Sequence, residues 1–489
     1  LDQRRFSEAA VTLDRVRPFL AKNEDKILYL YFHAEALWPL TEYTRANQAY
    51  VASSVLLRDR YFISTAIFRM GEYAAMQQKR EEAAQYAIRS AGILREDSWV
   101  LRRTGLFFMN IDMTERGLVY LERALERSDT LQSDADSYSA LADAYKRLND
   151  RDKYIEYARR YVDTINRIIA QNGDYTDQQR GLAAFYQGEI LFSEEKFKEA
   201  YASYEAASQL VTEPYRLADI YIIMAEYQAT AGNIDQAETL AVKSADLLPG
   251  DVWKARQVGG LLVRLGKRSK ANLYLEKALE LSFSVQERAY STAALADACL
   301  AWREIPRFLD YADEYTALVK MHRDQFTEAQ EGLAAFFQGE IYHYQGDGRR
   351  AYQQYEQATK LLDDRFKRSE AWMRMADIKA VAGEMEEAAA LADKSADELR
   401  DQGWKMRLVG NFFMRFGLYG KAEDYYQRYV RMSAPDDPLL YHSILADAYK
   451  DANRQEPYIR AAGEYIKAAT AGGRAPTGEE AGLMAYYQG

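Results

Sequence analysis

Cysteine is almost absent from this chain. Cys299 is the single cysteine among 489 residues, and it lies in the apolar run STAALADACLAW. One thiol excludes an internal disulfide framework and a metal site built from several cysteines. We expect Cys299 to be a small buried side chain. A low cysteine content suits the cytosol and an oxidising compartment equally, so it leaves the localisation open.

Histidine is also scarce, and residues that could form a catalytic constellation are not found together. No two of the four histidines have the spacing of zinc ligands on one helix: His33, His322, His343 and His442. No serine or cysteine has a neighbouring histidine that would mark an activated nucleophile. The segment GDGRR (346–350) has neither the preceding strand nor the lysine–hydroxyl pair of a phosphate-binding loop. We therefore expect no catalytic residues, no metal site and no cofactor.

Long apolar runs and blocks of like charge are missing as well. No run approaches the roughly 18 apolar residues that a membrane helix needs. The 64 basic and 74 acidic residues give a net charge of −10, and no basic stripe appears that could bind nucleic acid. We expect neither a membrane segment nor a nucleic-acid partner. The hydrophobic content of 48% is sufficient for a large core.

One phrase occurs three times, about 150 residues apart. It reads GLAAFYQGEI from Gly181, GLAAFFQGEI from Gly332 and GLMAYYQG from Gly482. Three tryptophans follow similar offsets of 154 and 151 residues: Trp99, Trp253 and Trp404. Self-similarity at a fixed period indicates duplicated blocks. We predict three long blocks: 27–180, 181–331 and 332–481. Residues 1–26 are then the tail of a preceding block, and residues 482–489 are the start of a truncated further repeat.

Both ends of the chain look like cuts made within a longer protein. The chain opens with LDQRRFSEAAV, without a methionine or a secretory signal, and it stops inside the repeated phrase. Each end is expected to expose an unpaired, partly apolar helix. A localisation signal could therefore lie outside this sequence.

Each block divides into four smaller units. A small residue is followed twelve positions later by alanine, then four later by a bulky residue and three later by a small one: Gly188, Ala200, Tyr204 and Ala207, for example. Apolar residues around these anchors recur at the helical spacings i, i+3, i+4 and i+7. Glycine or asparagine lies in the short breaks, such as TAGNID (230–235), where one helix ends and another begins. Each small unit is predicted to be a pair of antiparallel helices.

This pattern resembles the tetratricopeptide repeat (TPR) family over nearly the whole chain. The resemblance implies an all-α fold: a right-handed α-solenoid, or superhelix, of about twelve repeats in three four-repeat blocks. The period averages about 37 to 38 residues, longer than the standard 34. In the fourth repeat of each block a bulky residue replaces the expected alanine, which predicts a different helix crossing and a kink there: Tyr154, Phe308 and Tyr458.

In TPR solenoids the first helix of each repeat lines the concave groove, so residues that recur there are binding candidates. We number each repeat so that its small anchor residue is position 8. Aromatic or arginine side chains then recur at position 5, acidic side chains at position 9, and aromatic or histidine side chains at position 12. The candidates are Tyr31, Glu35, Trp38, Arg102, Asp143, Phe185, Glu189, Phe192, Glu226, Arg256, Asp297, Phe336, Glu340, His343, Arg407 and Asp447. One interpretation is a groove that binds an extended polypeptide or polymer by stacking and charge-assisted bonds. The other is structural: Glu226 pairs with Arg256 across the groove, and the aromatic residues fill the core.

The leading functional hypothesis is a non-catalytic scaffold that binds protein partners. Long arrays of this kind also look like the periplasmic TPR region of bacterial outer-membrane exopolysaccharide-export proteins, which recruit polymer-modifying enzymes. That resemblance favours the bacterial periplasm over the cytoplasm, although a cytoplasmic assembly factor remains an alternative. Two further hypotheses are direct binding of a polysaccharide or other polymer in the groove, and a regulatory segment of a larger enzyme. Polymer binding by stacking requires Phe185 and Phe336 to have exposed faces.

Overall fold

The computed structural model describes residues 3–171, 173–434, 437–470 and 477–488. Within these residues the regular structure is entirely helical, with 26 α-helices and three short 3-10 helices. The chain divides into two compact units, Leu1–Leu248 and Pro249–Gly489, which are described separately. Residues 1 and 2 of the expected N-terminal tail, and Gly489 at the end of the third phrase, lie outside the described residues. The block boundaries remain a prediction from the sequence.

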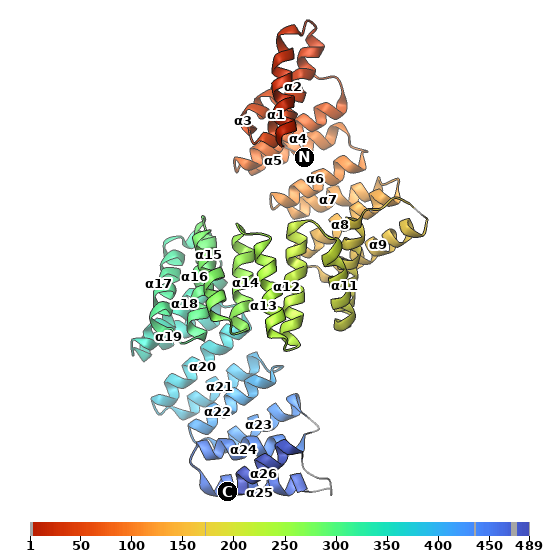
Figure 1. Ribbon diagram of the computed structural model, residues 1–489. Coiled ribbons are helices and arrows are strands. Elements are labelled where there is room, and N and C mark those ends of the chain that lie inside the picture. Colours follow the sequence, from red (N-terminus) through yellow and green to blue (C-terminus); the bar gives the residue numbers. More distant parts are fainter. Residues whose placement is uncertain (1–2, 172, 435–436, 471–476, 489) are drawn as a thin grey trace. The chain divides into compact units, whose positions relative to one another are not determined.

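The first unit consists of an initial helix followed by antiparallel pairs (Figure 1). Each even-numbered helix packs on the odd-numbered helix that follows it. The helices have these bounds: α1 Gln3–Val16, α2 Asn23–Leu37, α3 Tyr43–Ser54, α4 Arg60–Met76, α5 Arg80–Ile93, α6 Ser98–Asn110, α7 Thr114–Glu126, α8 Leu131–Arg147, α9 Arg151–Ala170, α10 Asp177–Ser193, α11 Phe197–Leu210, α12 Pro214–Thr230 and α13 Ile234–Asp246.

The second unit continues the same arrangement of pairs and ends with a single helix. Its helices have these bounds: α14 Val252–Arg264, α15 Arg268–Glu280, α16 Val285–Ala301, α17 Ile305–Met321, α18 Glu328–Tyr344, α19 Gly348–Leu361, α20 Arg365–Val381, α21 Met385–Glu398, α22 Gly403–Arg415, α23 Tyr419–Ser433, α24 Pro438–Asp451, α25 Gln455–Thr470 and α26 Gly478–Gln488. The prediction of an all-α solenoid built from antiparallel helix pairs is confirmed.

The turn inside each pair from α2–α3 to α24–α25 contains one residue whose backbone has a positive φ, the left-handed conformation. Five of these turns use glycine, as Gly232 does with φ +79°, because glycine has no Cβ to clash there. The other seven use a residue with a side chain, such as Glu195 with φ +62°. A left-handed residue with a Cβ costs on the order of 1 kcal/mol, so the turn geometry is maintained by the packing of the two helices.

A close crossing holds α10 against α11. Gly188 lies where a Cβ would come within 2.7 Å of Cε1 and 2.8 Å of Cδ1 of Tyr204. Gly339 and Tyr355 have the same relationship in α18 and α19, with both ring distances at 2.7 Å. The small anchor of the repeat pattern therefore allows a tyrosine ring to lie against the helix backbone. This contact explains the glycine in the recurring phrase.

The second aromatic residue of the recurring phrase inserts into the preceding helix pair. The ring centroid of Tyr186 lies 6.3 Å from that of Tyr154 and 5.2 Å from that of Tyr161. Phe337 lies in the same way against Phe308 and Tyr315, at 6.1 and 5.4 Å, and Tyr487 lies against Tyr458 and Tyr465, at 6.4 and 5.2 Å. The bulky residues that depart from the repeat pattern thus pack against the first helix of the next block. The predicted kink stays a prediction.

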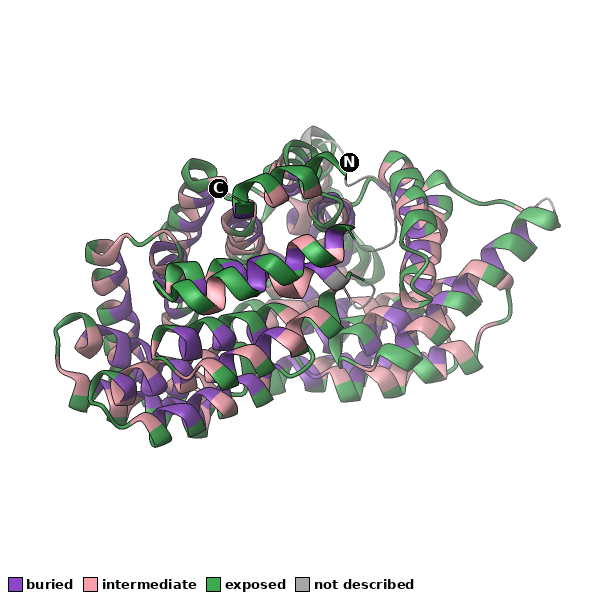
Figure 2. Ribbon diagram, turned by 90° about the horizontal axis from the view of Figure 1, so that it is seen from below, coloured by how far each residue is buried: buried purple, intermediate pink, exposed green. Residues whose placement is uncertain are grey.

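The core follows the helix pairs: in the first unit, one buried cluster lies among α1 to α4 and another among α4 to α6. Figure 2 shows buried residues along the sides of the helices that face neighbouring helices, with exposed residues on the outer sides. Cys299 is fully buried, as its apolar surroundings in the sequence predict. None of the helices among the described residues is both long enough and apolar enough to cross a membrane.

Candidate functional site

A pocket with a volume of about 960 Å³ lies among helices α8 to α12 of the first unit; we call it the α10 pocket. Three of the sequence candidates line it: Glu189, Phe192 and Glu226. The repeated glutamate and aromatic positions of the first helices therefore do meet at one site in this unit.

Exposed and half-buried aromatic rings form the walls of the α10 pocket. Phe192 and Phe197 are each 45% exposed, and their rings meet edge to face with centroids 5.2 Å apart. Tyr201 and Tyr227 stack with centroids 4.7 Å apart. Large, rigid aromatic side chains contribute much contact area at little cost in conformational entropy. The walls can therefore bind an apolar or aromatic group.

The polar floor of the α10 pocket is satisfied by the chain itself. Tyr204 donates a hydrogen bond to Oε1 of Glu189, and Tyr154 donates one to Oε2, each at 2.7 Å. Burial, followed by the negative charge of Glu189, raises the pKa of both tyrosines well above their usual value, so the hydroxyls stay protonated. Glu189 is half-buried and serves first as an acceptor for two tyrosines.

The equivalent glutamates of the other blocks make the same tyrosine contact. Tyr50 donates to Glu35 and Tyr355 donates to Glu340, each at 2.7 Å. Glu340 is fully buried and also lies 2.7 Å from Nε of Arg374. The structure therefore corrects the expectation that Glu340 is a groove residue, because a ligand cannot reach a fully buried carboxylate.

The aromatic residues at position 5 are interior residues. Phe185 and Phe336 are fully buried, and Tyr31 is 5% exposed. Arg216 lies 5.0 Å from the ring of Phe185, and Lys367 lies 4.8 Å from the ring of Phe336. These rings fill the core and cannot stack on a polymer, which corrects the expectation that they line the groove.

The same two cations pair with the aspartates predicted for the groove. Nη2 of Arg216 donates to both carboxylate oxygens of Asp143, at 2.8 and 2.7 Å. Nζ of Lys367 donates to Asp297 at 2.7 Å. Asp447 is exposed and accepts a hydrogen bond from Tyr487 at 3.2 Å. Asp143 and Asp297 thus link the fourth repeat of one block to the second repeat of the next.

The three repeated arginines have different surroundings. Arg102 donates to Asp136 at 3.1 Å, whereas Arg256 lies 5.1 Å from the ring of Tyr290. Burial lowers the pKa of Arg256 from its usual value. Arg407 is exposed, with its guanidinium 5.8 Å from the ring of Tyr429. Glu226 and Arg256 belong to different units, so their expected pairing stays a prediction.

Position 12 of the first repeats varies in exposure as well as in residue type. Trp38 is half-buried, and the guanidinium of Arg69 lies 5.1 Å from its ring. His343 is half-buried and meets Tyr344 edge to face with centroids 5.6 Å apart. Phe192 is therefore the most open aromatic residue at this position.

Sequence reasoning missed a second set of exposed aromatic residues. The three tryptophans that mark the repeat are about half exposed: Trp99 at 50%, Trp253 at 54% and Trp404 at 50%. An exposed aromatic residue precedes each by 38 positions: Tyr61, Tyr215 and Phe366. The recurrence of the tryptophans was visible in the sequence, but periodicity alone does not distinguish an exposed tryptophan from a buried one.

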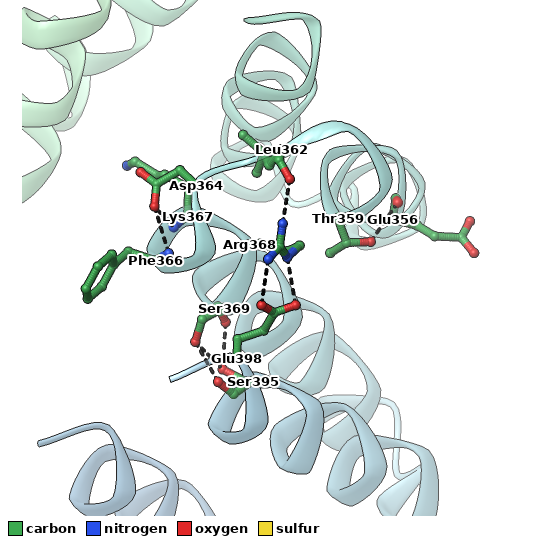
Figure 3. Close-up of polar contacts among 10 residues, drawn as sticks. All are labelled: Glu356, Thr359, Leu362, Asp364, Phe366, Lys367, Arg368, Ser369, Ser395 and Glu398. Carbon is green, nitrogen blue, oxygen red and sulfur yellow. Dashed lines mark hydrogen bonds and ion pairs between the residues drawn. The ribbon is translucent and has the colours of Figure 1, made fainter. Parts of the chain in front are cut away.

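Phe366 and Trp404 line a second pocket, of about 460 Å³, which lies between α20 and α22; we call it the α22 pocket. Figure 3 shows Phe366 at the start of α20, with its ring directed away from the contacts that join α20 to α21. In these contacts Arg368 binds both carboxylate oxygens of Glu398, at 2.7 and 2.8 Å. Asp364 caps α20 by accepting from the backbone N–H of Phe366.

Among the described residues, no group of three or more histidine, cysteine, aspartate or glutamate side chains is placed to hold a metal ion. No protein-family model matches the chain, and no curated protein matches it.

Two solved structures of TPR-type helical repeat proteins resemble the chain. The first is the APC/C hetero-tetramer Cut9–Hcn1, with a TM-score of 0.42 and 13% identity, covering 100% of this chain and 94% of that chain. The second is a monomeric mutant of IFIT1 with Gppp-AAAA, with a TM-score of 0.46 and 14% identity, covering 88% of this chain and 96% of that chain. At these values neither comparison carries an argument about a ligand or a partner.

Proposed function

We propose that the chain is a non-catalytic scaffold that binds a protein partner through the α10 pocket. The observation that carries the proposal is a pair of exposed phenylalanine rings, Phe192 and Phe197, beside a polar floor whose carboxylate already accepts two hydrogen bonds. Binding hot spots in protein interfaces are rich in aromatic residues that lie in pockets. The walls are thus suited to an apolar side chain of a partner.

The volume of the α10 pocket favours a side-chain anchor as its occupant. About 960 Å³ is at the upper end of the range for small-ligand pockets, and it can hold two or three side chains of a helix or an extended peptide. The charges of Lys146, Arg151 and Glu226 also line the pocket. These groups can orient the polar flanks of the bound segment.

The finer setting is also a proposal. We infer an exopolysaccharide-export assembly in the bacterial periplasm from sequence resemblance alone, and a polymer-modifying enzyme would then be the partner. Direct polymer binding has no support at Phe185 and Phe336, because both rings are buried. The sequence of the full-length gene product tests whether the chain is the regulatory segment of a larger enzyme. Co-purification of such an enzyme with the scaffold tests the export setting.

Site-specific photo-crosslinking tests the scaffold function. A photoreactive phenylalanine analogue placed at Phe192 or Phe197 should capture a discrete protein in cells of the source organism. The same analogue at Phe283, which is 94% exposed in the second unit, is the matched control and should not capture that protein.

The captured protein is then purified and its affinity measured by titration calorimetry. Phe192→Glu with Phe197→Glu should weaken binding at least tenfold, because a charged group would have to be buried against the partner. Phe283→Glu should leave the affinity unchanged. Capture of the same proteins from all three positions, or equal affinity of all variants, would refute binding through the α10 pocket.

A further inference from the structure

One largely buried lysine of the second unit has no hydrogen bond or ion pair for its ammonium group among the described residues. Lys405, in α22, is 4% exposed and lines the α22 pocket. Among the described residues its ammonium group has no hydrogen bond and no ion pair within 4 Å. Burial of most of the side chain lowers the pKa of Lys405 to about 8, even though the nearby charge of Glu370 opposes the shift.

The equivalent lysine one block earlier has a hydrogen-bond acceptor on its own helix. Lys254 lies 151 positions before Lys405 and is 2% exposed. Its Nζ donates a hydrogen bond to Oε1 of Gln257 at 2.9 Å. At the position that corresponds to Gln257 the later block has Leu408, which also lines the α22 pocket. This acceptor is therefore absent at Lys405, and a pocket is open beside it.

The carboxylates around the α22 pocket are already bound within the chain. Glu370 lies 3.7 Å from Nζ of Lys367 and 3.9 Å from Nη2 of Arg374. Asp377 pairs with Arg415 and Asp364 caps α20. Among the described residues that line the pocket, the ammonium group of Lys405 is the one charged group with neither a hydrogen bond nor an ion pair within 4 Å, and an anionic group of a ligand complements it.

The remaining walls of the α22 pocket are apolar. Phe366 is 47% exposed and Trp404 is 50% exposed, and Met373, Leu399 and Leu408 complete the lining. A pyranose ring carries several hydroxyl groups that each need a partner, whereas among the described lining residues Lys405 alone has a charge with neither a hydrogen bond nor an ion pair within 4 Å. The lining fits one carboxylate together with one apolar side chain, which favours a peptide over a polysaccharide.

We propose that the α22 pocket binds a segment of a protein partner in which an acidic side chain lies next to an apolar one. The acidic side chain pairs with the ammonium group of Lys405, and the apolar side chain packs against Phe366 and Trp404. This inference rests on the proposed scaffold function, and it adds the chemistry of the segment that the second unit recognises.

Capped peptides test the proposal directly on the complete chain. Four fluorescent peptides with blocked ends contain Asp-Leu, Asp-Phe, Glu-Leu or Glu-Phe in a glycine–serine host, and their affinities are measured by fluorescence anisotropy. At least one should bind. Replacing its acidic residue by the amide, or its apolar residue by serine, should weaken binding at least tenfold, the usual effect of losing a charge-assisted bond or a buried side chain.

Variants of the pocket separate a binding role from a structural one. Lys405→Gln and Leu408→Gln should each lower the affinity for the peptide at least tenfold. Leu408→Gln does so because the new glutamine provides an internal acceptor for Lys405, as Gln257 does for Lys254. Leu408 is 42% exposed, so this change should preserve the fold, which a thermal melt checks. Lys254→Gln is the matched control and should leave the affinity unchanged.

Proton uptake gives an independent readout. Pairing with a carboxylate raises the pKa of Lys405, so binding at pH 8 should take up a fraction of a proton, measurable by calorimetry in buffers of different ionisation enthalpy. Failure of all four peptides to bind, or unchanged affinity in both pocket variants, would overturn the inference. Binding of oligoglucuronate without any peptide would assign the pocket to an acidic polysaccharide instead. Crosslinking at Phe192 is independent of these outcomes, so it tests the scaffold function separately.

Discussion

Gly188 of α10 lies directly against the ring of Tyr204 of α11, and the hydroxyl of the same tyrosine binds the next residue, Glu189. A Cβ on Gly188 would lie 2.7 Å from the ring, closer than carbon atoms approach without a shift. The glycine thus allows both the close helix crossing and the hydrogen bond. This pair of contacts recurs at Gly339, Glu340 and Tyr355.

Substitution at this crossing should be destabilising. Gly188→Ala is expected to lower the free energy of unfolding by about 1–3 kcal/mol, because the Tyr204 ring must move away from its acceptor. Gly260→Ala is the control: Gly260 lies within α14 and has nothing within 4 Å of its added Cβ. That change should stabilise by about 0.5–1 kcal/mol through helix propensity. If chemical denaturation gave the same change in free energy of unfolding for Gly188→Ala and Gly260→Ala, the close crossing of α10 and α11 would be contradicted.

Removal of the buried carboxylate should be still more costly. Glu340→Ala leaves the Arg374 guanidinium and the Tyr355 hydroxyl without their acceptor, and we expect a loss of about 3 kcal/mol. Glu328→Ala removes an exposed carboxylate from the first turn of the same helix and should cost less than about 1 kcal/mol. Denaturant titration measures the loss in free energy of unfolding for each variant. Equal losses for Glu340→Ala and Glu328→Ala would mean that Glu340 is accessible.

The left-handed turns offer a test in the stabilising direction. Glu195 has φ +62° between α10 and α11, and Glu195→Gly should stabilise by up to about 1 kcal/mol as strain at its Cβ is relieved. Gly232→Ala, at φ +79° in the next pair, should destabilise by about 1 kcal/mol. Thermal melts of the two variants should shift in opposite directions, and a shift in the same direction would contradict the assigned turn geometry.

The buried charge of Lys405 predicts a specific pH dependence. Its pKa is about 8 in the folded chain and 10.5 for an ordinary lysine, because burial disfavours the ammonium form while Glu370 opposes the shift. Between these values the unfolded chain holds more protons, so the contribution of Lys405 to stability rises as the pH increases from about 8 to 10.5. Lys405→Met should therefore stabilise by roughly 3 kcal/mol below pH 8.

This advantage of the methionine variant should disappear near pH 10.5. Lys367, Arg374, Glu370, Asp364 and Asp377 also line the pocket, and all are present in both chains, so the difference between the two curves isolates Lys405. Chemical denaturation of both chains at several pH values measures this difference in free energy of unfolding. A constant difference across this range would show that Lys405 titrates as an exposed lysine.

The helix pairs and their packing anchors were predictable from the sequence because small and bulky residues recur at helical spacing. The spacing of Gly188, Ala200 and Tyr204 places them on facing sides of two helices in any antiparallel pair. The candidate site was only partly predictable. Glu189 and Phe192 do line the α10 pocket, whereas Phe185, Phe336 and Glu340 are buried in the core.

The sequence by itself determined that the chain is a stack of antiparallel helix pairs, because periodic burial leaves a periodic pattern. Only the tertiary structure decided which recurring side chains face solvent, because duplication copies core and surface residues equally well. Trp404 and Phe336 recur with the same regularity, yet one is half exposed and the other is fully buried. The unpaired charge of Lys405 also depends on contacts between different helices, which no local spacing encodes.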